Sequence, residues 1–443
     1  MEIVQPLIGI VLILCIAFLV SERRKEVLVK GVFKGLILQF AIALLLLKTS
    51  EFQSIFLRLN DAVLAIQKAT LAGTSLVFGY VGGGVLPFKE VNEGGSFILG
   101  FQALPMILIF SALSSVLYYW RVLPIVVNIF AWGLRRVFAL SGATSFATIA
   151  TVFVGMVEAP LLVRPYLKDM NRSELFIVMA SGMATISGTV LVLYATFLQN
   201  SVPGAISHLL IASIISAPAA VMLGLIVVPL TNEQEKSIKL EQVDLLTSLK
   251  MLLRREQPSQ SNLEISLNHS RESLMDAISE GTYQGLKLLA NVIAMLIVLV
   301  ALVALINNFL AYLPNFFDSP LTLQRLVGWF LQPFAWTLGL DWRDCAVAGQ
   351  LLGTKLVLNE FIAYLDLSKL PDGSLSEKGR VLMTYLLCGF ANFGSLGIVI
   401  GGLGAMAPQR KKEIIEMGAR SLLVGMLSTC LSGSMAAIIL FGF

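Results

Sequence analysis

Charge is scarce in this chain of 443 residues, and its scarcity excludes whole classes of protein. Only 14% of the residues are charged, whereas soluble globular proteins carry roughly 25%. Hydrophobic residues make up 56%, and the mean hydropathy is +0.82. So few charges cannot cover the surface of a soluble enzyme, a disordered chain or a nucleic-acid-binding protein, and the net charge of +4 is too small to imply an anionic partner. The composition therefore predicts a polytopic membrane protein.

Cysteine and histidine are also rare. The four cysteines lie far apart, in or beside apolar stretches and without a CxxC spacing, which favours simple packing roles. The two histidines cannot build a metal centre alone, and neither HExxH nor GxSxG occurs. We expect His208, which lies in an apolar stretch, to be a packed, hydrogen-bonded residue. The sequence thus argues against an intramembrane enzyme, and we expect no cofactor.

Long apolar runs are abundant. A spanning helix needs about 20 mostly apolar residues. Uncharged runs predict about eight such helices, with the fourth run contributing two of them; the runs are 3–21, 35–47, 96–120, 175–232, 288–317, 381–409 and 421–443. Residues 50–70 and 121–138 mix charged and apolar residues at helical spacing, so we expect interfacial helices there. We expect a loop around 257–262 and another interfacial helix from about Ser270.

Basic residues predict the orientation of the spans. One cluster follows the first span at 23–25, and another separates the last two at 410–412. With eight spans both clusters fall on one side, which the positive-inside rule assigns to the cytoplasm, and both termini fall outside. The first apolar run lacks a basic region before it, so we interpret it as a retained anchor rather than a cleaved signal.

Two glutamates interrupt this pattern. Glu158 lies in the apolar stretch 150–165, and Glu360 lies in the apolar stretch 349–361. An ionised carboxylate at membrane depth costs several kcal/mol unless it is paired or hydrated, so such residues indicate a functional site. Glycine and proline beside Glu158 interrupt a helix, and broken backbone is tolerated there only if it is buried in protein or lines a cavity.

The two glutamate segments occupy corresponding positions. Each precedes an apolar helix with a small, polar patch, at 184–188 and at 390–395. Paired interrupted segments in two halves indicate a transporter with internal repeats and a binding site near the midplane. We accordingly divide the chain into N-terminal scaffold and interfacial helices, a first hairpin unit, a loop with an interfacial helix, and a second hairpin unit; the ranges are 1–138, 139–230, 231–285 and 286–443.

The residue types in these segments suggest a substrate. Two carboxylates, the Asn392 carboxamide and the Ser395 hydroxyl can bind several hydroxyls of an uncharged, sugar-like molecule. Phe390 and Phe393 offer faces for a planar ring, as a nucleobase would need. Unwound carbonyls and threonine hydroxyls at the first break can hold a cation. A polar-solute channel remains an alternative, because it too needs polar groups at membrane depth.

At these residues the sequence resembles the concentrative nucleoside transporter family. The resemblance extends from about Gly73 to the C-terminus, is weaker in the first two helices, and is carried by the stretches 155–167, 184–188, 355–361 and 388–393. It implies a multi-pass protein of a bacterial cytoplasmic (inner) membrane. It further implies a homotrimer with eight transmembrane helices, interfacial helices and two re-entrant helical hairpins per subunit. An inverted-repeat transport domain would move in an elevator-like manner against a trimeric scaffold.

The resemblance also implies a nucleoside site. The second-hairpin glutamate, with the Asn and Ser on the following helix, would hold the ribose, while the first hairpin faces the base. The implied substrate-binding residues are Met156, Val157, Glu158, Val190, Glu360, Phe390, Asn392 and Ser395. Many family members have Gln-Thr where this chain has Met156-Val157. Members with Gly-Met at this place tend to favour purine nucleosides, and Gly155-Met156 matches that pattern. We therefore expect a purine preference.

The coupling ion is the second departure from the family pattern. Carried over residue by residue, the sodium-binding positions are Thr151, Val154, Thr185 and Ile186. Thr151 replaces an asparagine, but its hydroxyl can still ligate a cation. We therefore expect sodium as the coupling ion. The alternative is a proton-coupled transporter that accepts a broader range of nucleosides, with Glu158 or Glu360 as the proton carrier.

Overall fold

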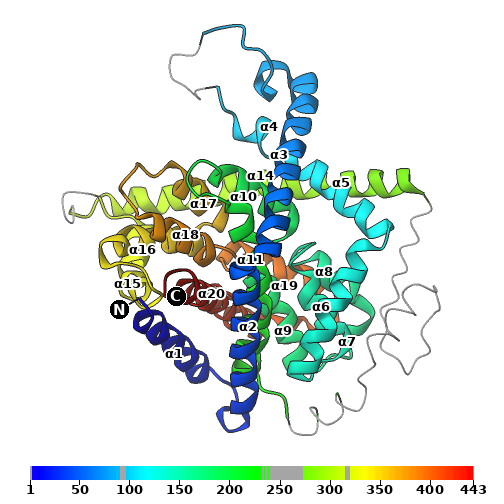
Figure 1. Cartoon of the computed structure of the whole chain (residues 1–443), viewed down its shortest axis with the longest axis vertical. Helices are drawn as coiled ribbons and strands as arrows, with labels where there is room; N and C mark the ends of the chain where they lie inside the picture. The colour runs from blue at the N-terminus through cyan, green and yellow to red at the C-terminus, as the bar shows by residue number, and fades with distance from the viewer. Residues whose placement is uncertain are drawn as a thin grey trace.

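Helices account for nearly all the regular structure of this chain. The computed structural model describes residues 2–89, 96–231, 234, 238, 273–314 and 320–442, and no strand occurs within these ranges. This confirms the expected all-α fold. The loop expected around 257–262 lies outside the described residues. Figure 1 shows α20 at the centre of the helices, with α1 and α2 beside it. The chain ends meet, because a Cβ on Gly442 would lie 2.7 Å from Ile3.

The described residues up to Phe138 contain six α-helices. They are α1 (Val4–Leu19), α2 (Val29–Lys48), α3 (Ser50–Phe78), α4 (Leu99–Gln102), α5 (Met106–Tyr119) and α6 (Val122–Phe138). Helix α6 covers the segment 121–138 for which an interfacial helix is expected, and it buries Val127, Ala131 and Leu134 on one face while Ile129 and Phe130 are exposed.

Helix α3 differs from its prediction. The segment expected to be interfacial over 50–70 is part of one helix that continues to Phe78, and residues 61–82 are long and apolar enough to cross a membrane. Asp61 begins this segment and Lys68 lies within it, so the segment as a whole is not an uncharged run. In all, the described residues contain seven helices of that kind, and α1 and α19 (Phe393–Met406) are shorter apolar helices.

Helix α14 (Leu274–Leu310) is the longest helix of the described chain. It joins the interfacial helix expected from Ser270 to the following span, and so crosses the proposed boundary at 285/286. It packs on α5 closely, because a Cβ on Gly281 would lie 2.5 Å from that of Ser115. The Ser115 hydroxyl donates to the Ala277 carbonyl at 2.6 Å. Little of the remaining surface of α14 is covered by this chain.

The rest of the chain repeats one order of elements: a hairpin, an interrupted helix and a long helix. The first set is α7 (Gly142–Ala150), α8 (Glu158–Leu162), α9 (Arg172–Ala184), α10 (Gly188–Leu198) and α11 (Ala205–Val227). The second set is α16 (Trp342–Val357), α17 (Glu360–Lys369), α18 (Glu377–Leu386), α19 and α20 (Lys411–Phe441), preceded by α15 (Leu323–Thr337), which packs on α16. Every hairpin arm is shorter than a spanning helix needs, as expected of re-entrant hairpins.

The two long helices form the core. Helices α11 and α20 pack against each other, α9 packs on both, and nearly all their side chains are buried. Ser216 of α11 and Ser432 of α20 hydrogen-bond at 2.9 Å, and Gln39 of α2 donates to Ser432 at 3.2 Å. These contacts join helices of both halves, as polar side chains commonly do in membrane bundles.

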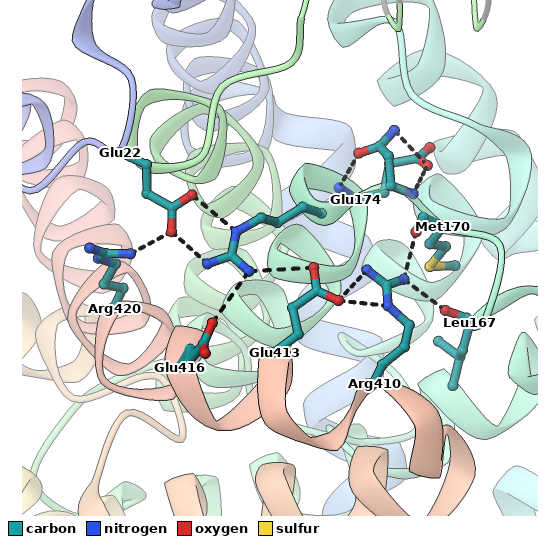
Figure 2. A network of polar contacts seen from close by, with 10 residues as sticks. Glu22, Leu167, Met170, Glu174, Arg410, Glu413, Glu416 and Arg420 are labelled. Carbon is teal, nitrogen blue, oxygen red and sulfur yellow. Dashed lines mark hydrogen bonds and ion pairs between the residues drawn. The ribbon is translucent and has the colours of Figure 1, made fainter.

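A network of charged side chains closes one end of this core (Figure 2). The Arg172 guanidinium, at the start of α9, donates to Glu22 at 2.8 Å and to Glu413 of α20 at 3.5 Å. Arg420 also pairs with Glu22, and Arg410 donates to the Leu167 carbonyl at 3.0 Å. The basic clusters at 23–25 and 410–412 therefore lie at the same end of the molecule, as expected.

The pKa of the Glu22 carboxyl, in the linker between α1 and α2, is lowered. The hydrogen bond from Arg172 is the largest cause, partial burial opposes it, and the charges of Arg172 and Arg420 add to it. The ionised carboxylate thus holds the linker against α9 and α20.

Candidate functional site

The second hairpin and the interrupted helix after it meet at a capped pair of helix starts. The Asn359 side chain accepts a hydrogen bond from the Ile362 amide at 2.9 Å, so Glu360 becomes the first residue of α17. Asn392 caps α19 in the same way, its Oδ1 accepting from the Ser395 amide at 2.7 Å. Each break thus starts a new helix next to a polar side chain.

Glu360 and Asn392 are in direct contact. The Asn392 Nδ2 donates to Glu360 Oε2 at 2.8 Å, and both residues are buried. Because Oδ1 is committed to the α19 cap, the amide group can turn only its nitrogen toward the carboxylate. The structure therefore brings together two of the expected ribose-binding residues. Buried Ser395 follows on the first turn of α19.

Tyr194 completes this cluster and was not foreseen from the sequence. Its hydroxyl donates to the other carboxylate oxygen, Glu360 Oε1, at 2.8 Å. Tyr194 lies on α10, one turn after Val190, and both side chains are buried. The only available signal was a phenol in a mostly apolar helix, since a buried Tyr hydroxyl normally finds a partner.

The tip of the first hairpin packs against both interrupted helices. The Phe153 carbonyl accepts from the Gly188 amide, at the start of α10, at 3.1 Å. Met156 lies against α9, because a Cβ atom added to Gly182 would be 3.0 Å from the Cβ atom of Met156. Val157 lies against α19, because a Cβ atom added to Gly402 would be 3.1 Å from a side-chain methyl group of Val157. Both side chains are half-buried.

Glu158 starts α8 at this tip. Its side chain is exposed within the single chain, and the carboxylate turns back over Gly155, where a Cβ would lie 2.5 Å from Oε2. Gly155 also has a φ of +129°, which other residues rarely adopt. Phe390, in the break before α19, is half-buried, whereas Phe393 is exposed.

The four expected cation ligands lie at the first hairpin turn and the break after α9. The Thr151 and Thr185 hydroxyls are buried and donate to the carbonyls of Thr148 and Ser181, at 2.7 and 2.9 Å. Their protons are thus directed away, and oxygen lone pairs remain for a cation. The Ile186 carbonyl accepts from the Ser213 hydroxyl at 3.1 Å, and a carbonyl has a second lone pair.

As ligands, the oxygen atoms at these four positions suit sodium better than a transition metal. Val154 is half-buried in the hairpin turn, which is tied to the α10 start by the Phe153–Gly188 hydrogen bond. All these groups supply neutral oxygens. Among the described residues no group of three or more His, Cys, Asp or Glu could hold a metal ion.

Two further polar side chains contact α18, the helix that precedes the break at Asn392. Lys355 of α16 donates to the Leu386 carbonyl, at the end of α18, at 2.8 Å and to Thr429 of α20 at 3.0 Å. This contact anchors the end of α18, where the break toward Asn392 begins. His208 is hydrogen-bonded to the Tyr385 hydroxyl at 2.8 Å, which confirms the packed role expected for it.

Comparisons with known families identify the family to which this chain belongs. A family model described as "Na+ dependent nucleoside transporter C-terminus" matches residues 208–437. The corresponding N-terminal model matches residues 8–81, and a gate model described as "Nucleoside recognition" matches residues 100–201. The chain belongs to the sodium-dependent nucleoside transporter family.

Relatives within this family cover nearly the whole chain. The sequence is 32% identical over 439 residues to the putative nucleoside permease NupX of Escherichia coli, covering 98% of each protein. It is 32% identical to the sodium/nucleoside cotransporter 2 of Rattus norvegicus, covering 97% of this chain and 62% of the rat protein.

Solved structures of the transporter CNTnw share the fold. The structure in an inward-facing, substrate-bound state has a TM-score of 0.84 and 31% identity, and covers 100% of this chain and 99% of that one. A variant of CNTnw in an outward-facing state has a TM-score of 0.83 and 30% identity. The protein is thus a multi-pass membrane protein with the fold of a nucleoside transporter rather than of an enzyme.

Proposed function

We propose that the protein takes up nucleosides by cation-coupled secondary active transport. The Glu360–Asn392 pair carries this proposal, because a carboxylate and an oriented carboxamide next to Ser395 match the hydroxyls of a ribose. Nucleoside transport by the relatives supports the substrate class.

Uptake would proceed by alternating access. CNTnw has been solved in inward-facing and outward-facing states, and this chain matches both. We propose an elevator-like movement of the unit built from the two hairpins and interrupted helices. We further propose a homotrimer in a bacterial inner membrane. Native mass measurement in detergent should give about three times 48.1 kDa.

A purine preference is the finer proposal for the substrate. Met156 and Val157 stand at the tip of the first hairpin, and neither side chain can hydrogen-bond to a pyrimidine edge as Gln and Thr can. Met156 packs near the end of α9, next to Gly182, and Val157 packs on α19 next to Gly402, so the tip contacts both interrupted helices.

Uptake competition tests the purine preference. Guanosine should displace labelled inosine or adenosine from proteoliposomes more strongly than uridine or cytidine does. The Met156→Gln variant should narrow the difference by restoring an amide at the hairpin tip. Equal displacement by all four nucleosides in the unaltered protein would refute the preference, while leaving nucleoside transport intact.

Sodium is the proposed coupling ion, with Thr151, Val154, Thr185 and Ile186 as ligands. The orientation of the two threonine hydroxyls supports it, because their donated protons point away from the turn. Accumulation of labelled nucleoside against its gradient should require sodium, and Thr151→Val should weaken the sodium dependence. Accumulation that continues in sodium-free choline buffer and collapses with a protonophore would favour the proton alternative. Uptake that never exceeds equilibration would favour a channel.

A further inference from the structure

Glu360 is held from both halves of the molecule. Its Oε2 accepts from Asn392, which belongs to the second half, as Glu360 does. Its Oε1 accepts from Tyr194 on α10, which belongs to the first half and lies 166 residues away in sequence. Two donors, one on each oxygen, fix both the position and the plane of the carboxylate.

Tyr194 is itself placed rigidly. Its ring is tilted against that of Tyr364, with centroids 4.7 Å apart, and meets Phe361 edge-on at 6.0 Å. The side chain is 1% exposed, so its hydroxyl has little freedom to move away from Glu360. Phe361 and Tyr364 both lie on α17, the helix that Glu360 begins. The ring stack and the hydrogen bond therefore join the same two helices.

We propose that Tyr194 is a positioning residue for nucleoside binding, acting through the carboxylate of Glu360. The inference rests on the proposed function. An ionised carboxylate can accept about four hydrogen bonds, and Tyr194 and Asn392 use one on each oxygen. The remaining lone pairs are then directed to fixed points, where they can accept from ribose hydroxyls. With only Asn392 holding it, the carboxylate could turn about its own axis, and binding would have to restrict that rotation.

The proposal makes Tyr194 a determinant of discrimination between ribose and deoxyribose. The affinity for a substrate that lacks the hydroxyl bound by Glu360 does not depend on how precisely the carboxylate is positioned. Loss of the Tyr194 hydroxyl should therefore weaken binding of the ribonucleoside more than binding of that deoxy analogue. A tyrosine that only packs the helix would weaken both equally.

The experiment compares Tyr194→Phe with Tyr364→Phe in proteoliposomes. Both substitutions remove one buried hydroxyl from the same ring stack, but the Tyr364 hydroxyl donates to the Thr384 carbonyl at 2.7 Å, away from Glu360. Uptake of adenosine, 2′-deoxyadenosine and 3′-deoxyadenosine is measured for each. In Tyr194→Phe the KM for adenosine should rise about tenfold with the maximal rate within a factor of two.

The preference for adenosine over one of the deoxy analogues should shrink by a similar factor in Tyr194→Phe and stay unchanged in Tyr364→Phe. This preference is a ratio within one variant, so a smaller amount of folded protein does not alter it. A preference that is unchanged in Tyr194→Phe, or that falls equally in Tyr364→Phe, would overturn the inference. Absence of nucleoside uptake by the unaltered protein would instead overturn the proposed function.

Discussion

Single residues at the two hairpin tips decide where the carboxylates point. Glu360 is directed by its neighbours, since Tyr194 and Asn392 each donate to one of its oxygens. Glu158 is directed by its own backbone, because the turn at Gly155 lets the carboxylate fold back over it. The same residue type is thus positioned by tertiary contacts in one hairpin and by local conformation in the other.

Gly155→Ala should reduce nucleoside uptake by more than tenfold. The new Cβ would meet the Glu158 carboxylate, and the φ of +129° would cost roughly 1–3 kcal/mol of strain. Uptake and thermal unfolding of the purified variant would be measured together. Gly204→Ala is the matched control, since Gly204 also has a positive φ, +66°, but nothing lies within 4 Å of its Cβ position. If both variants lose uptake equally, strain alone accounts for the loss and the contact with Glu158 is irrelevant.

At the scale of elements, interrupted helices start and stop at polar groups. Asn392 caps α19 and Lys355 holds the carbonyl end of α18, so the break between them is defined at both sides. The far end of the core is held by charge instead, through Glu22, Arg172 and Arg420. This network connects the linker between α1 and α2 to α9 and α20, and it does not include the hairpin tips.

The charged network predicts a dependence of stability on pH. Because Arg172 lowers the pKa of Glu22 below its ordinary value of 4.5, the pairing stabilises the folded state fully above that value. The stabilisation is lost as the pH falls through the lower, folded pKa. The Tm of Glu22→Gln should therefore lie roughly 2 °C below that of the unaltered protein at pH 7, and the difference should shrink toward pH 4.

Glu26→Gln provides the control for this measurement. Glu26 pairs with Arg23 at 2.9 Å, but its side chain is 41% exposed, so its contribution should be close to zero. A gap between the unaltered protein and Glu22→Gln that stays constant from pH 7 to pH 4 would contradict the role assigned to the Glu22 charge.

At the scale of the whole molecule, the two halves contribute to one candidate site. Glu360 of the second half is held by Tyr194 of the first, and Val157 of the first half packs on α19 of the second. Neither half contains the complete site, so a nucleoside that binds there should stabilise the entire fold.

Nucleoside binding should accordingly raise the Tm of the purified protein. A ligand that binds only the folded state adds about 2.7 kcal/mol at 100 times its Kd. A thermal shift by adenosine that grows with sodium concentration, and that choline does not reproduce, is the expected outcome. Glu360→Gln should abolish the shift, because its amide would face a donor. Glu377→Gln, an exposed change in the first turn of α18, should preserve it. A full shift in Glu360→Gln would exclude this carboxylate from the site.

Much of the fold could be predicted because its signals are local. Scarce charge and long apolar runs predict a membrane protein, and two glutamates beside helix breaks predict paired hairpins. The spans differ from the expectation at residues 61–82, which form an apolar helical segment although they include Asp61 and Lys68. The sequence predicts two separate helices where the structure has the single helix α14. The composition changes near residue 286, but the helix continues through this position without a break.

The sequence by itself determined the membrane class, the repeated hairpins and the identity of the carboxylates, because each depends on residues close together in the chain. Only the tertiary structure decided which groups meet. No local pattern distinguishes a tyrosine that faces lipid from one that donates to Glu360, and the two residues are separated by 166 positions. Their contact depends on how α10 packs against the second hairpin, which is a property of the assembled helices.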